Sequence, residues 1–160
     1  MKIDDLFLID VARSKSTEDY SPGSIPFVTN TEINNGVVRY VDPLDKDKVF
    51  DGPAICISGL GYATVQFGKF LPKGNGGDSC TVLLPKTKMS NYEILYYSAL
   101  FNVAHGWRFT FGRKTSKTRL KDLDLEPVFA DSPVCLSDEI ELNNKLMTKL
   151  LLEKEIEIKG

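Results

Sequence analysis

The alternation of apolar and polar positions along the chain predicts a series of short strands and two longer helices. Short apolar or alternating runs bounded by turn residues are typical of strands. Residues 3–12 mix apolar and acidic positions and fit either a short helix or an opening strand. Six further runs are predicted as strands: 24–29, 37–41, 54–57, 62–70, 79–84 and 123–128.

Turn signals separate these runs. Asn34-Asn35-Gly36 favours the positive φ angles of a tight turn, and Ser58–Gly61 reads as a second turn. Residues 72–78 form a glycine-rich loop without the Gly-Lys-Ser/Thr ending of a phosphate-binding loop. Residues 42–51 hold several aspartates, but their spacing is not that of a calcium loop, which favours a solvated loop.

Two helices are predicted by capping residues and apolar spacing. Ser90 with Glu93 forms a capping box before a helix of about four turns that stops near Gly106. Ser132-Pro133 marks a boundary, and Ser137 can cap a last helix of about 15–20 residues. The apolar stripe of this last helix has two alternative partners, the protein's own core or another chain. It comprises Ile140, Leu142, Leu146, Met147, Leu150 and Leu151.

Residues 105–121 concentrate positive charge. This stretch carries six cationic side chains and no acidic one, with aromatic residues interleaved at its start. Such a stripe is the electrostatic pattern of a polyanion-binding face; a solvated charged loop is the alternative. Trp107, Phe109 and Phe111 alternate as on one face of a strand, after which Gly112 leads into a loop and a short helix. The cations are Arg108, Arg113, Lys114, Lys117, Arg119 and Lys121.

Charge is segregated along the chain. The whole chain has a net charge of −2 at pH 7. Residues 21–121 carry thirteen basic and seven acidic side chains, whereas residues 122–160 carry four basic and ten acidic ones. This division predicts a body that meets a polyanion and a C-terminal segment that meets protein or solvent.

Several chemical classes are not supported by the sequence. The single histidine, His105, has no catalytic arrangement around it, so we expect no catalytic residues and no cofactor. Cys56, Cys80 and Cys135 are dispersed, which argues against disulfides and a zinc site, and Cys56 is expected to be buried. The chain has no apolar run long enough to cross a membrane and no signal-peptide pattern at its start. We therefore expect a cytoplasmic protein without metal.

Several motifs, in this order and spacing, resemble one family. They are Ile25-Pro26-Phe27-Val28-Thr29, Asn34-Asn35-Gly36-Val37-Val38, Phe50–Ser58, Phe109-Thr110-Phe111-Gly112-Arg113-Lys114 and Arg119–Leu123. Together they are similar to a target-recognition domain of the specificity (S) subunits of type I restriction-modification systems, and of related type IIB and IIG systems. The resemblance covers roughly residues 4–130.

The resemblance implies an α+β (mixed α/β) domain with an irregular, curved sheet and packed helices, over residues 1–131. Such a domain reads one half of a bipartite sequence in double-stranded DNA, largely in the major groove. The segment 132–160 would begin the spacer helix that follows each domain and docks the methyltransferase subunit. Methyl transfer and cleavage belong to the modification and restriction subunits. A full specificity subunit carries two recognition domains, whereas this chain has room for one. Three interpretations are therefore possible: a half-subunit that dimerises through 137–154, an excised domain, or a mobile-element variant.

The resemblance and the charge pattern together predict one DNA-facing surface. It joins residues 105–121 to the turns around Thr29–Gly36 and Ser58–Tyr62, where Gly59 and Gly61 would let the backbone approach DNA. Besides the six cations, the candidate contacts are Thr29, Thr31, Asn34, Asn35, Ser58 and Tyr62. Arginine can contact guanine and asparagine can contact adenine, each through two hydrogen bonds. The alternative is a protein-interaction module whose basic residues 105–121 and last helix bind an acidic partner.

Overall fold

The computed structural model describes residues 1–76, 78–125 and 136–159. The chain divides into two compact units, Met1–Glu126 and Pro127–Gly160, and each is described by itself. The functional roles expected of residues 1–131 and 132–160 stay predictions. None of the helices in the described ranges is long and apolar enough to span a membrane.

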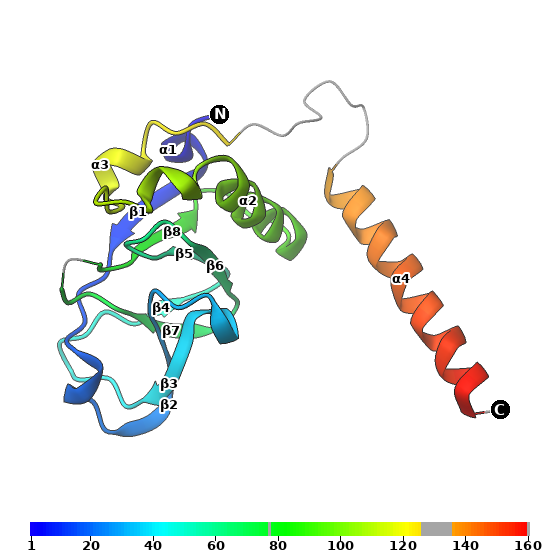
Figure 1. Ribbon diagram of the computed structural model, residues 1–160, viewed down its shortest axis with the longest axis horizontal. Coiled ribbons are helices and arrows are strands. Elements are labelled where there is room, and N and C mark those ends of the chain that lie inside the picture. Colours follow the sequence, from blue (N-terminus) through cyan, green and yellow to red (C-terminus); the bar gives the residue numbers. More distant parts are fainter. Residues whose placement is uncertain (77, 126–135, 160) are drawn as a thin grey trace. The chain divides into compact units, whose positions relative to one another are not determined.

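The first unit contains two four-stranded sheets with helices packed on one of them (Figure 1). The first sheet has the order β1-β8-β5-β6 and is antiparallel throughout. Its strands are β1 (Phe7–Val11), β5 (Ala54–Ile57), β6 (Ala63–Gln66) and β8 (Thr81–Pro85). The second sheet has the order β3-β2-β7-β4, in which β2 and β7 run parallel. Its strands are β2 (Pro22–Val28), β3 (Val37–Val41), β4 (Phe50–Asp51) and β7 (Lys69–Pro72).

Short helices connect these strands. α1 (Ile3–Leu6) precedes β1, so residues 3–12 form both of the elements that the sequence allows. The 3-10 helices are η1 (Thr17–Asp19), η2 (Ile33–Gly36) and η3 (Gly106–Phe109). The α-helices after the strands are α2 (Asn91–Ala104), α3 (Lys117–Leu120) and, in the second unit, α4 (Leu136–Lys159). The predicted α+β class is therefore confirmed, with two sheets in place of one.

Both faces of the first sheet are buried. Ile55, Ile57 and Leu83 pack in a cluster with α2, whereas Cys56 and Val82 pack with residues of the second sheet. All four residues of β5 are buried, which explains why its sequence is a continuous apolar run. Cys56 is 1% exposed, and the neighbouring Cys80 thiol together with burial raises its pKa. The first sheet therefore forms the buried layer against which α2 packs.

Three sequence predictions need correction. The run 62–70 is two strands, because it leaves the first sheet after Gln66 and enters the second at Lys69. Residues 123–125 form only an isolated bridge, between Asp124 and Lys2, while 126–128 and the boundary at Ser132-Pro133 lie outside the described residues. α4 has 24 residues and begins at Leu136, so Ser137 lies within its first turn. The extra length follows from Glu and Lys near its end, which are good helix formers.

Candidate nucleic-acid interface

The capping box predicted at Ser90 is present and starts α2. The Ser90 hydroxyl accepts a hydrogen bond from Glu93 N at 3.2 Å, and the Glu93 carboxylate accepts one from Ser90 N at 2.7 Å. At the other end, His105 N donates to the Phe101 carbonyl at 2.8 Å. The His105 ring Nε2 lies 2.6 Å from the Asp124 carbonyl oxygen. α2 therefore fixes the point from which residues 105–121, named here the basic strip, leave the core.

The start of the basic strip is a 3-10 helix, not the predicted strand. η3 continues directly from α2, and Phe109 is 4% exposed and stacks on Phe101 with ring centroids 6.2 Å apart. Trp107 and Phe111 are 67% and 92% exposed. Alternation gives a common face only in extended backbone, and in a helical turn residues two apart point in different directions. Only Phe109 is therefore part of the core.

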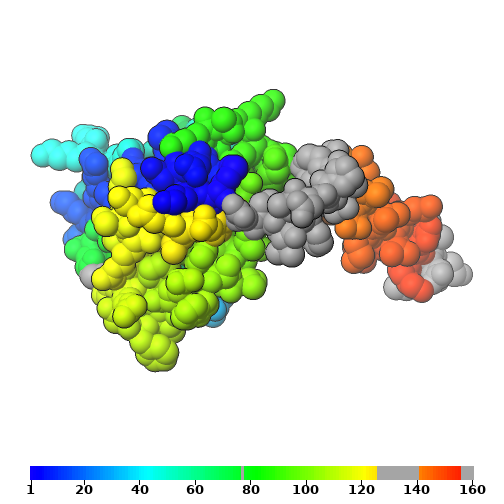
Figure 2. Space-filling model, turned by 90° about the horizontal axis from the view of Figure 1, so that it is seen from above, coloured from blue at the N-terminus to red at the C-terminus, as the bar shows by residue number. Residues whose placement is uncertain are grey.

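The end of the basic strip is the short helix that the sequence predicts. The Ser116 hydroxyl caps α3 by accepting a hydrogen bond from Arg119 N at 3.3 Å. Leu120 is fully buried and anchors the helix. The Lys121 carbonyl accepts a hydrogen bond from Asp4 N at 3.2 Å, which places the strip beside the N-terminal residues (Figure 2). The strip is thus held at both ends and in its middle.

All six cations of the basic strip are exposed. Within the described part of the chain, none of the six forms an ion pair with a carboxylate. Among the described residues, no bonded acid neutralises their positive charge, which faces solvent. The charge of the strip does affect one described carboxylate, that of Asp78. The pKa of Asp78 is lowered first by a hydrogen bond from Lys73 at 2.9 Å and, more weakly, by the positive charge of Lys114.

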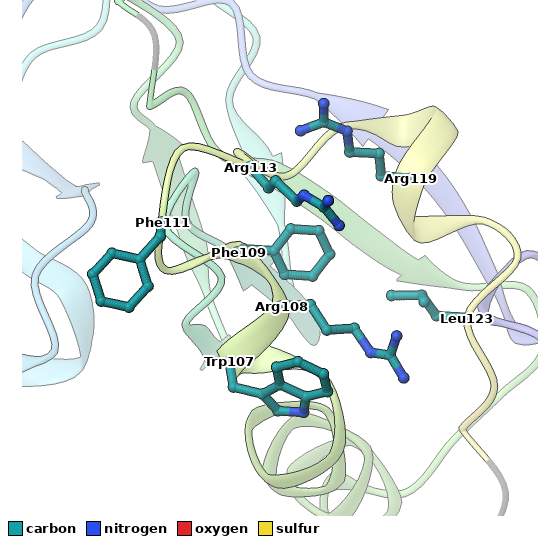
Figure 3. Close-up of a pocket in the computed structure, with 7 residues that line it drawn as sticks. All are labelled: Trp107, Arg108, Phe109, Phe111, Arg113, Arg119 and Leu123. Atoms are coloured by element: carbon teal, nitrogen blue, oxygen red, sulfur yellow. The ribbon is translucent and has the colours of Figure 1, made fainter.

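Three of the arginines surround a hollow of about 760 Å³ (Figure 3). Arg108 lies over the Trp107 ring, 4.9 Å from its centroid, which is the geometry of a cation–π contact. Arg119 also donates to the Lys114 carbonyl at 2.7 Å, which restricts its side chain. The lining residues are Trp107, Arg108, Phe109, Phe111, Arg113, Arg119 and Leu123. The hollow is thus cationic and aromatic at once.

The three segments predicted to share a surface do meet. The Thr115 backbone N–H and hydroxyl donate to the carbonyls of Gly59 and Ser58, at 3.0 and 2.9 Å, which ties the strip to the 58–62 turn. A second hollow, of about 340 Å³, joins the strip and this turn to the 29–36 turn through Glu32. Its lining residues are Glu32, Leu60, Gly61, Tyr62, Asn102, Gly106, Trp107 and Thr110. The predicted juxtaposition is therefore present.

The two asparagines of the 29–36 turn have structural roles. Asn34 and Asn35 take positive φ angles of 52° and 53°, as the turn motif predicts. The Asn34 amide donates to the Val37 carbonyl at 3.2 Å. The Asn35 amide donates to the Val65 carbonyl at 2.8 Å, and the Gln66 amide donates to the Asn35 carbonyl at 3.0 Å. A base contact from either side chain would have to replace its amide hydrogen bond or use the second amide hydrogen and the amide oxygen.

The remaining candidates differ in accessibility. Thr29 and Thr31 are half-buried, and their hydroxyls accept hydrogen bonds from the turn backbone at 3.4 and 3.2 Å. Tyr62 is half-buried and lines the second hollow. Ser58 is 3% exposed, and its hydroxyl accepts a hydrogen bond from Tyr62 N at 3.1 Å. Because Ser58 is buried and holds the turn, we remove it from the candidate contacts.

Thr115 and Gly61 hold the basic strip against the 58–62 turn, and the sequence does not reveal these roles. Thr115 gives no signal in the sequence, since its partners are 57 and 56 positions away. The sequence predicts that Gly61 lets the backbone approach DNA. Instead, a Cβ at Gly61 would lie 2.7 Å from Phe109 Cβ and 2.8 Å from the Gly106 carbonyl oxygen. The close approach is thus to the basic strip itself.

Gly61→Ala is expected to lower the free energy of unfolding by at least about 2 kcal/mol, because it combines a clash with a φ of +88°. Gly112→Ala is the matched control, since its φ is +70° but nothing lies within 4 Å of a new Cβ. The control should lose only about 1–2 kcal/mol. Urea unfolding measures both, and equal losses would show that Gly61 does not support the strip.

Metal chemistry receives no support from the described side chains. In the ranges that the structure describes, no three His, Cys, Asp or Glu residues are grouped so that they could hold a metal ion. The arrangement offers positive charge, exposed aromatic rings and two hollows that share Trp107 in their linings. These features are suited to binding an anionic, ring-containing polymer.

Comparison with known proteins places the chain in a family. The family model described as the type I restriction modification DNA specificity domain matches residues 1–128. The specificity subunit of the type II restriction enzyme BcgI from Heyndrickxia coagulans is 26% identical over 132 residues, which are 81% of this chain and 38% of that protein.

Solved structures share the fold at low identity. The HsdS subunit from Thermoanaerobacter tengcongensis has a TM-score of 0.55 at 15% identity, over 77% of this chain and 31% of that one. The S subunit from M. genitalium has a TM-score of 0.54 at 12% identity, over 97% and 43%. A chain from a structure of type I restriction-modification complex assembly has a TM-score of 0.62 at 16% identity, over 99% and 42%. This chain therefore spans less than half the length of these relatives. Since the family model covers residues 1–128 of 160, the chain belongs to the type I restriction modification DNA specificity domain family.

Proposed function

We propose that this chain is a non-catalytic DNA-recognition component of a restriction-modification system and reads one half-site of a bipartite sequence. The observation that carries the proposal is the basic strip: six exposed cations, no acid in the strip, and an attachment to the core through Thr115 and Phe109. Family membership supports the same conclusion. Chemistry on the DNA would belong to partner subunits, and the chain would act in the cytoplasm.

Two classes of contact are expected on this surface. Arg113, Lys114, Lys117 and Lys121 are exposed and suited to phosphate oxygens. Arg108 and Arg119 border the larger hollow with Arg113, where a guanidinium can reach guanine through two hydrogen bonds. Thr29, Thr31, Asn34, Asn35 and Tyr62 stay candidates at the edge of the surface, supported by the hollow that joins their turns to the strip.

Salt dependence tests this proposal. If about four to six cations contact phosphates, log K for a duplex should fall with log[salt] at a slope of roughly −4 to −5. Fluorescence anisotropy with a mixed-sequence duplex, repeated from low to moderate salt, measures the slope. Heparin and polyglutamate serve as competitors without bases. Competition by either polyanion as effective as that by duplex DNA would favour the alternative, a protein-interaction module for an acidic partner.

The second unit supports a docking role. Leu142, Leu146 and Leu150 of α4 are all more than half exposed within this unit, as are Met147, Leu151 and Leu152. An apolar stripe on a helix needs a partner, because exposed leucines of this number are unusual in isolation. We propose that α4 pairs with a second copy of this chain or docks a methyltransferase subunit, with a restriction subunit joining the assembly.

Aspartates on the stripe are expected to abolish self-association. The double variant Leu146→Asp/Leu150→Asp should reduce the mass in solution from twice 17.9 kDa to 17.9 kDa, because each chain would bring two charges into the helix pair. Lys145→Asp/Thr148→Asp is the control, with two aspartates on the side of α4 opposite the stripe. Light scattering gives the masses. A wild-type chain that is already a monomer would contradict the homodimer and leave the methyltransferase as the proposed partner.

A further inference from the structure

Phe111 has an environment that the fold does not explain. Its side chain is 92% exposed, the highest value among the large apolar residues of the described chain. It precedes Gly112, whose φ of +70° turns the backbone, and a Cβ at Gly112 would have no neighbour within 4 Å. In Figure 3 the Phe111 ring points away from the other side chains that line the hollow. The ring thus occupies the tip of a projecting turn and packs against little of the core.

The residues around Phe111 indicate which class of partner its ring would contact. A single exposed apolar residue is ordinary on a protein surface and by itself indicates nothing. Here Arg113 and Lys114 follow within three residues. Trp107 presents a second exposed ring, which the Arg108 guanidinium contacts on one face. An acidic protein partner would match the cations, but it does not present charges and flat apolar faces together in a regular array. Nucleic acid matches both, because phosphates meet the cations and bases offer flat apolar faces.

We propose that Phe111 is a wedge that inserts between neighbouring base pairs of bound duplex DNA. Apolar side chains that do so partly unstack one base step, and the proteins that use them also place Arg or Lys side chains in the groove. Arg113 and Lys114 supply those cations on the same turn, and Trp107 with Arg108 forms a platform beside it. This inference rests on the proposed DNA-binding function and deepens it, since it adds a contact that reads the deformability of a base step.

Phe111→Ala distinguishes the contribution of the Phe111 ring to DNA affinity from that of the phosphate contacts. We expect about tenfold weaker binding to the duplex that wild type enriches from a random pool, within the range that stacking losses show. The salt slope should stay unchanged, because no charge is removed. Phe111→Leu is the matched variant that keeps an apolar wedge, and it should retain most of the affinity. The stability of both variants should equal that of wild type, because the side chain is 92% exposed.

A fluorescent base gives the direct readout. 2-Aminopurine, placed in turn at each step of the enriched duplex, should brighten at one step with wild type and not with Phe111→Ala. Equal affinity of Phe111→Ala and wild type would overturn the wedge. Weaker binding of that variant without brightening at any step would also overturn it, because it would place the ring in a groove. If wild type enriches no duplex at all, the proposed function fails, and the wedge fails with it.

Discussion

Replacing Arg113 and Lys114 together with alanine is expected to weaken duplex binding at least about tenfold. Both side chains are exposed, and neither forms an ion pair with a described carboxylate. Removing two phosphate contacts should also make the salt slope shallower by roughly 2. Anisotropy titrations at several salt concentrations give both quantities, and circular dichroism shows whether the fold is intact.

The matched control removes the same charge elsewhere. Lys46→Ala/Lys88→Ala eliminates two exposed cations outside the basic strip, from the loop between β3 and β4 and from the segment before α2. Its affinity should stay within about twofold of wild type at moderate salt, where charges beyond the contact surface are screened. If both double variants lose the same affinity, binding follows net charge, and the basic strip is not the contact surface.

Phe101→Ala is expected to lower the free energy of unfolding by about 3–5 kcal/mol. Phe101 is fully buried, and its ring packs against both Phe109 and His105, with centroids 6.2 and 5.9 Å away. The substitution therefore leaves a cavity at the junction of α2 and the basic strip. Urea unfolding measures the loss, and DNA binding at low temperature reports whether the strip has moved.

Val103→Ala is the control on the same helix. Val103 is 81% exposed, so the substitution should change the free energy of unfolding by no more than about 0.5 kcal/mol. Similar losses for Phe101→Ala and Val103→Ala would contradict the stated packing of α2 on the strip.

Local signals predict the local structure well. Ser90 and Glu93 indicate the start of α2, and the Asn34-Asn35-Gly36 motif indicates a turn with positive φ angles, because both depend on residues within a few positions. The prediction of one strand over 62–70 is wrong, since nothing near Phe67 reveals that the chain changes sheets there. Such transfers are decided by tertiary packing.

In the candidate site, too, features set by nearby residues are predicted from the sequence, whereas features set by tertiary contacts are not. The charge of the basic strip is visible in the sequence, as is its short helix at Lys117–Leu120. The strand predicted for Trp107–Phe111 is wrong, because the chain continues from α2 as a 3-10 helix and no partner strand pairs with it among the described residues. The burial of Ser58 and the hydrogen bonds of Thr115 depend on contacts more than fifty residues apart, which no local pattern encodes.

The most direct test of DNA binding by the basic strip uses Trp107, the only tryptophan in the chain. Its indole is 67% exposed and lies in the strip beside Arg108, so its fluorescence reports on this surface alone. Adding duplex DNA at low salt should change Trp107 emission in a saturable way and protect it from quenching by acrylamide, and added salt should reverse both effects. If duplex DNA binds while the emission and quenching of Trp107 stay unchanged, DNA contacts another surface, and the basic strip is not the DNA-binding face of this protein.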